Sequence, residues 1–118
     1  DPDAEILARY ENGLPAIAEK TLDGWNSVYS ALYRLPSSLL TALYRKHGVF
    51  VYSDNPRVYT YVNSAMLGVY NASDADAEIS VPADGVYRDK IEGGAYTSEN
   101  GVLRLPKKPL RAYLLVRE

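Results

Sequence analysis

The sequence predicts a mainly β (α+β) fold: an antiparallel β-sandwich of about seven short strands, with one short helix near residues 37–47. Three observations predict it. Turn signals recur about every 8 to 12 residues in the second half of the chain. Apolar residues there recur with the period of two that is typical of strands. Only one stretch, which begins at Pro36, combines helical spacing with helix caps.

Composition excludes several classes of function. The net charge of −2 supplies no basic field for phosphates, so we expect no nucleic-acid partner. No apolar run approaches the roughly 18 residues of a membrane span, so we expect no membrane partner. The absence of cysteine removes disulfides, thiolate catalysis and cysteine metal sites. Because the chain of 118 residues starts at Asp1 rather than Met, we expect one domain, or one with part of a neighbour, cut from a longer protein.

The first third of the chain predicts a small set of strands around two turns. Asn12-Gly13 is a tight-turn signal between residues 5–10, which suit a strand or a helical turn, and residues 14–20, which suit a strand. Asp23-Gly24 is a second turn, and residues 25–32 form a third candidate strand.

The helix near residues 37–47 is predicted by its two ends. Pro36 fixes the entry, and Ser37 can cap the free backbone N–H groups. Leu39, Leu40, Leu43 and His47 share one stripe, and Gly48 is expected to end the helix in a left-handed conformation.

Strands are expected from residue 49 onward. Residues 49–52 form an apolar run, and Ser53-Asp54-Asn55-Pro56 is a strong turn. The later candidate strands are residues 58–62, 66–71, 77–81, 86–89, 96–97, 102–105 and 110–116. The seam at the turn predicts two segments, a strand-helix-strand segment at 1–54 and a β-sandwich at 55–118, which could pack as one unit.

No set of polar side chains in the sequence has the pattern of a catalytic site. His47 is the only histidine, and its place at the end of the helix favours a structural role. Asp74, Asp76 and Glu78 resemble the start of a calcium loop, but the glycine and the glutamate expected at its sixth and twelfth positions are missing. Asp84, Asp89 and Glu92 lie amid turn residues rather than flanking a cleft. We therefore expect no catalytic residue, no cofactor and no metal.

Tyrosine is unusually frequent, with 11 residues against one Trp and one Phe. The first interpretation is a half-buried β surface, because tyrosine favours strands. The second is a platform for sugars, since an aromatic face complements the C–H face of a pyranose ring. On this second interpretation the candidate carbohydrate-binding residues are Trp25, Tyr29, Tyr59 and Tyr61.

A family resemblance covers nearly the whole chain. The hairpin at residues 3–18, the stretch Gly24-Trp25-Asn26-Ser27-Val28-Tyr29 and the stretch Leu35-Pro36-Ser37-Ser38-Leu39-Leu40 resemble the end of an amidotransferase-like trimerisation domain. Such domains occur in β-galactosidase-type glycoside hydrolases, including family forty-two. Gly48-Val49-Phe50-Val51-Tyr52 resembles the strand that follows. Residues 58–70, 79–89 and 103–115 are similar to the small β-sandwich that closes such enzymes.

The resemblance implies a non-catalytic C-terminal accessory module of a multidomain glycoside hydrolase, not an enzyme by itself. The catalytic carboxylates of such enzymes lie on a barrel outside this chain. The implied partner is the catalytic barrel of the parent chain or a neighbouring subunit. The implied source is bacterial, with the module cytoplasmic or secreted together with its parent. Two alternatives stay open: a carbohydrate-binding module that stacks sugars on Trp and Tyr, and an independent protein-interaction domain that uses an exposed edge strand.

Overall fold

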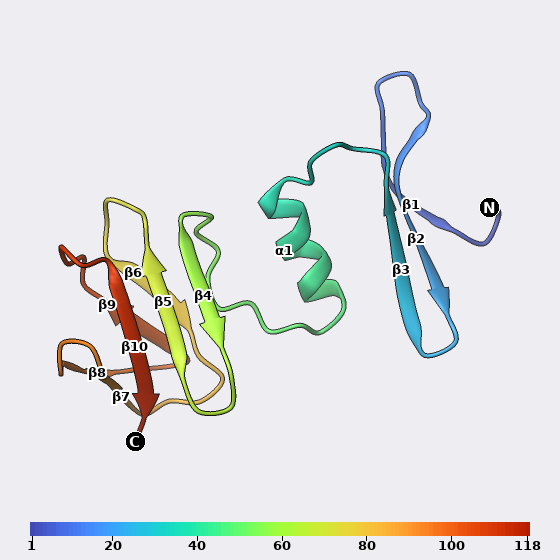
Figure 1. The fold of residues 1–118 in the computed structure, drawn as a ribbon. Coiled ribbons are helices and arrows are strands. Elements are labelled where there is room, and N and C mark those ends of the chain that lie inside the picture. Colours follow the sequence, from blue (N-terminus) through green and yellow to red (C-terminus); the bar gives the residue numbers. More distant parts are fainter. The chain divides into compact units, whose positions relative to one another are not determined.

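The computed structural model describes all residues, 1–118, as ten strands and one helix in two compact units, Asp1–Pro36 and Ser37–Glu118 (Figure 1). All strand pairs are antiparallel. The mainly β fold class with a single short helix is therefore confirmed.

The N-terminal unit is a three-stranded antiparallel sheet in the order β1-β2-β3. Its strands are β1 (Glu5–Arg9), β2 (Pro15–Leu22) and β3 (Trp25–Ser30). Asp23 and Gly24 alone separate β2 from β3, and Leu22 pairs directly with Trp25. Gly24 has a φ of +78°, a conformation that glycine adopts without steric cost.

The helix α1 (Ser37–Lys46) opens the C-terminal unit. It ends as predicted at Gly48, whose φ is +71°. The Val49 N–H reaches back to the Tyr44 carbonyl at 2.8 Å, which satisfies one of the last free carbonyls of the helix. Arg45 in the last turn forms an exposed ion pair with Asp54 at 2.6 Å.

The remaining seven strands form a sandwich of two sheets. They are β4 (Val58–Val62), β5 (Leu67–Asn71), β6 (Ala77–Ser80), β7 (Val86–Asp89), β8 (Ala95–Thr97), β9 (Val102–Leu105) and β10 (Ala112–Arg117). One sheet has the order β4-β5-β10-β7-β8, and the other pairs β6 with β9. The last strand of the chain thus lies in the middle of the larger sheet, as Figure 1 shows.

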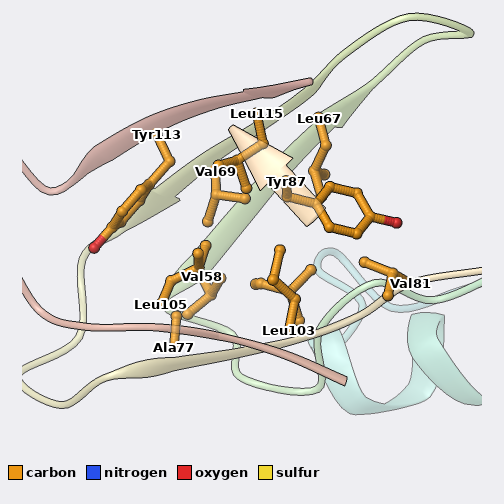
Figure 2. Close-up of a cluster of buried hydrophobic side chains, with 11 residues drawn as sticks. Val58, Leu67, Val69, Ala77, Val81, Tyr87, Leu103, Leu105, Tyr113 and Leu115 are labelled. Atoms are coloured by element: carbon orange, nitrogen blue, oxygen red, sulfur yellow. The ribbon is translucent and has the colours of Figure 1, made fainter. Parts of the chain in front are cut away.

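The core of the C-terminal unit lies between these two sheets. Val69 and Leu115 of the larger sheet point toward Leu103 and Leu105 of the smaller one (Figure 2). Inward residues recur at every second position, because successive side chains of a strand point to opposite faces. The outward residues of the larger sheet, among them Tyr59, Tyr61 and Tyr70, form its other face.

The segment at residues 49–52 differs from its prediction as a strand. It lies outside every ladder, and only the Tyr52 carbonyl accepts a bond from the Ser80 N–H of β6, at 2.7 Å. Two of its side chains pack instead: the ring centroids of Phe50 and Tyr52 lie 4.8 Å apart in an edge-to-face arrangement, and Tyr52 packs against the core. The division between the units falls after Pro36, whereas the turn signals placed the seam near residue 54.

Candidate functional site

Trp25 and Tyr29 lie on one face of the N-terminal sheet. Both belong to β3, and their even spacing directs their side chains to the same side. Their cross-strand partners are Leu22 and Ala18, and between them on the same face lie Ser27 and Lys20, which is ion-paired with Asp1 at 2.6 Å, so this face is part apolar and part polar. The exposed fractions of Trp25 and Tyr29 are 59% and 68%. This pair forms the first aromatic surface of the molecule.

Tyr59 and Tyr61 lie on the outer face of the larger sheet of the C-terminal unit. Both belong to β4, where Val58 points into the core and the tyrosines alternate with it. The exposed fractions are 49% for Tyr59 and 71% for Tyr61. Trp25 and Tyr29 therefore belong to one unit and Tyr59 and Tyr61 to the other, so the four candidates form two separate pairs.

Tyr70 extends the second pair into a cluster that the sequence did not indicate. It lies on β5 directly opposite Tyr59, with ring centroids 6.3 Å apart and ring planes inclined by 35°. Its exposed fraction is 44%. We call Tyr59, Tyr61 and Tyr70 the tyrosine face. The alternation of Leu67, Gly68, Val69 and Tyr70 could have indicated an outward tyrosine, but not its partner.

Gly68 leaves the tyrosine face open beside Tyr61. It is the cross-strand partner of Tyr61, and a Cβ built on it would lie 3.5 Å from the Tyr61 Cβ. Gly68 itself contributes no side chain beside the Tyr61 ring, and the next side chain across the sheet on this face is that of Leu114 on β10.

A buried ion pair lies elsewhere in the C-terminal unit. The Lys108 Nζ is 2.7 Å from the Asp89 Oδ2, and the Asp89 side chain is completely buried. The Asp89 Oδ1 accepts bonds from the backbone N–H groups of Ile91 and Leu114, at 3.0 and 3.1 Å. The ammonium group also binds Glu92 at 2.9 Å. We call Asp89 and Lys108 the buried pair.

The electrostatics of the buried pair keep both groups charged. Burial disfavours the Asp89 carboxylate, but the hydrogen bonds from Lys108, Ile91 and Leu114 outweigh it and lower the pKa of Asp89. Burial likewise disfavours the Lys108 ammonium, but its bonds to Asp89 and Glu92 raise the pKa of Lys108. At neutral pH neither group is poised to exchange a proton, so the pair is suited to hold strands together rather than to catalyse.

Tyr113 completes this cluster. The Lys108 ammonium lies 3.8 Å from the centre of the Tyr113 ring, a distance at which the cation is attracted to the ring face. The Tyr113 hydroxyl donates a hydrogen bond to the Pro106 carbonyl. Burial, with Tyr96 nearby, raises the pKa of Tyr113 to about 12. The phenol is therefore a fixed donor that ties β10 to the segment before it.

The acidic run at residues 74–78 pairs with cationic side chains and with the backbone. Asp74 lies 3.5 to 3.6 Å from basic groups of Arg57, Lys107 and Arg111, and Glu78 lies 3.1 Å from Arg104. The Asp76 carboxylate accepts the Lys107 N–H at 2.8 Å. No group of three or more His, Asp or Glu side chains is arranged to hold a metal ion.

Comparison of the chain with models of protein families, with curated proteins and with solved structures finds no match. The structure contains no helix with the length and apolar character needed to cross a bilayer.

Proposed function

We propose that this chain is a non-catalytic accessory module of a multidomain glycoside hydrolase of the β-galactosidase type. The sequence resemblance supports it, and one structural observation carries it: one face of the N-terminal sheet exposes Trp25 and Tyr29. That face would dock against the catalytic barrel of the parent chain or against a neighbouring subunit.

The residue types on this face are those that dominate interfaces. Trp and Tyr are enriched among interface residues whose truncation costs about 2 kcal/mol or more. Leu22 and Ala18, the cross-strand partners of Trp25 and Tyr29, add apolar area to this face, and Lys20 and Ser27 add polar groups between them. A partner that covers this face would remove large aromatic surfaces from water.

The first test is the reading frame that encodes this chain. A (β/α)₈ barrel with two glutamates at strand ends, in the same frame, is the expected result. A frame that encodes no sugar-cleaving domain would overturn the proposal. In addition, the chain alone should release no chromophore from chromogenic β-galactosides, and turnover that survives repurification would contradict the non-catalytic role.

The second test uses the whole parent enzyme. Trp25→Ala combined with Tyr29→Ala should lower its melting temperature or dissociate its subunits. Tyr33→Ala is the matched control, since Tyr33 is fully exposed in the same unit and lies outside the strands. Equal behaviour of the double variant and the control would show that the face of Trp25 and Tyr29 is not a docking surface.

The tyrosine face supports a second candidate function, carbohydrate binding. Three exposed tyrosines lie on two adjacent strands, and no charged residue occurs between Val58 and Ser73. Neutral aromatic rings with hydroxyl groups at their edges suit the apolar C–H faces and polar rims of pyranoses.

A titration with galactose- or glucose-type oligosaccharides tests this second candidate. Binding at the tyrosine face should shift the NMR signals of β4 and β5 and should be lost in Tyr61→Ala but retained in Tyr33→Ala. Trp25 fluorescence reports separately on the N-terminal sheet, to which Trp25 belongs. Saturable quenching of Trp25 would instead place the sugar on the N-terminal sheet, and a flat titration at millimolar sugar would remove this candidate.

A further inference from the structure

Strand β4 is an edge strand of the larger sheet, and at its Val58 end it borders a pocket that is also lined by Ser38 and Thr41 of α1. The strand order leaves β4 and β8 at the two edges. Natural edge strands are commonly kept from pairing by charged residues, proline or shortness. β8 has only three residues, but β4 has five, Val-Tyr-Thr-Tyr-Val, with neither charge nor proline. The lack of charge continues to Ser73, so the edge carries no electrostatic protection.

The hydrogen bonds of β4 show which backbone groups face outward. The Arg57 carbonyl accepts the Ala72 N–H at 2.8 Å, and the Asn63 N–H donates to the Met66 carbonyl at 3.1 Å. Because bonded and non-bonded positions alternate along an antiparallel pair, the odd-numbered residues of β4 bond to β5. The N–H and C=O groups of Thr60 therefore point away from the sheet.

The sequence of β4 reads the same in both directions about Thr60. In an antiparallel pair of two such strands centred on Thr60, Thr60 faces Thr60, Val58 faces Val62, and Tyr59 faces Tyr61. Each residue thereby meets one of matching size and polarity, and no like charges oppose. Aromatic and β-branched cross-strand pairs of this kind are favourable.

We propose that a second copy of this chain pairs with the first along β4, antiparallel and with a two-fold axis at Thr60. The two five-stranded sheets then form one continuous ten-stranded sheet. Thr60 exchanges two backbone hydrogen bonds with its symmetry mate. The Val62 N–H donates to the Val58 carbonyl of the other copy, while the Val58 N–H keeps its bond to Asn55 at 3.0 Å.

The pairing also joins the two tyrosine faces. Residues directly opposite in an antiparallel pair project from the same face, so Tyr59 of one copy lies beside Tyr61 of the other. Because Tyr70 already stacks beside Tyr59, each copy adds three tyrosines to one shared surface. The dimer does not depend on the proposed role in a glycoside hydrolase, and it would double any sugar-binding platform.

The area of the contact places this interface in the class of weak, transient ones. The exposed parts of Tyr59 and Tyr61 with Thr60 and Val62 offer about 400 Å² per copy. The total of about 800 Å² is below the roughly 1,200 Å² at which stable interfaces begin. The dimer is therefore weak, and its population rises with protein concentration.

Sedimentation equilibrium of the whole chain tests the proposal. The average mass should rise with concentration from 13.1 kDa toward twice that value. Thr60→Pro removes an outward N–H, and proline is tolerated at such edge positions, so this variant should stay monomeric. Thr97→Pro is the matched control on β8. Ser98 bonds to Gly85, so the neighbouring Thr97 N–H also points outward, and this variant should still dimerise.

Two double variants at the same exposed positions test the register without depending on Thr60. In the variant with Tyr59→Glu and Tyr61→Lys, both cross-strand pairs between positions 59 and 61 of the two copies join opposite charges. In the variant with Tyr59→Lys and Tyr61→Lys, both pairs join like charges. The Glu/Lys variant should associate about tenfold or more tightly than the Lys/Lys variant. Equal association of the two variants, or a wild-type chain that stays monomeric at millimolar concentration, would overturn the proposal.

Discussion

Replacing Lys108 with methionine removes the cation of the buried pair and keeps most of the apolar stem of the side chain. The Asp89 carboxylate then stays completely buried with only two N–H donors, from Ile91 and Leu114. Breaking a buried ion pair typically costs about 3–5 kcal/mol. Because the two donors remain, we expect the lower end of this range, about 3 kcal/mol of unfolding free energy for the C-terminal unit.

The assay is thermal and urea unfolding of the wild type, Lys108→Met, Asp89→Asn and the double variant. For a unit of this size, about 3 kcal/mol corresponds to a melting temperature lower by about 12–24 °C. Asp89→Asn should cost less, because Lys108 keeps Glu92 as a partner. The two substitutions should be strongly non-additive, with a coupling of about 2 kcal/mol.

A matched ion pair lies one residue away and serves as the control. Arg88 forms an ion pair with Glu118, but both side chains are substantially exposed. Arg88→Met should therefore leave the midpoints of thermal and urea unfolding unchanged within error. A coupling below about 0.5 kcal/mol between Asp89 and Lys108 would refute the reasoning, since it would mean that the two charges do not stabilise each other in the folded chain.

Three further outcomes follow from the same unit. The lowered pKa of Asp89 means that its stabilisation is complete above the ordinary Asp pKa and is lost as the pH falls through the folded pKa. The stability gap between wild type and Asp89→Asn should therefore shrink below about pH 4, as measured by urea unfolding. A spectrophotometric alkaline titration should show a tyrosine with a pKa of about 12, and Tyr113→Phe should remove that component. Leu103→Ala should lower the unfolding free energy by about 2–5 kcal/mol, because Leu103 is completely buried between the sheets.

The elements that the sequence predicted best are those whose ends are marked by capping or turn residues. The helix α1 begins at Ser37 and ends before Gly48, whose positive φ acts within one turn of the backbone, so no distant contact is needed to recognise either end. The strands after residue 55 follow from period-two alternation bounded by turn residues. Those signals are also local, and all seven strands occur.

Features that depend on distant pairing could not be predicted. Residues 49–52 have the composition of a strand, but alternation does not show whether a partner strand exists. Tyr70 joins Tyr59 only through the register of β4 with β5. Asp89 lies amid turn residues in the sequence, and its ion pair with Lys108 depends on a contact between residues 19 positions apart in the chain.

The position of β10 bears on how the protein is made. Its neighbours in the sheet are β5 and β7, both synthesised long before it. While the chain emerges from a ribosome, β4-β5 and β7-β8 can form only as separate hairpins, each with an uncovered apolar face. The sheet closes when the last strand inserts between them, a non-local step that slows folding and exposes the nascent chain to aggregation. A chain truncated before residue 112 would therefore divide the larger sheet in two rather than trim its edge, and would leave the inward faces of two separate hairpins exposed to water.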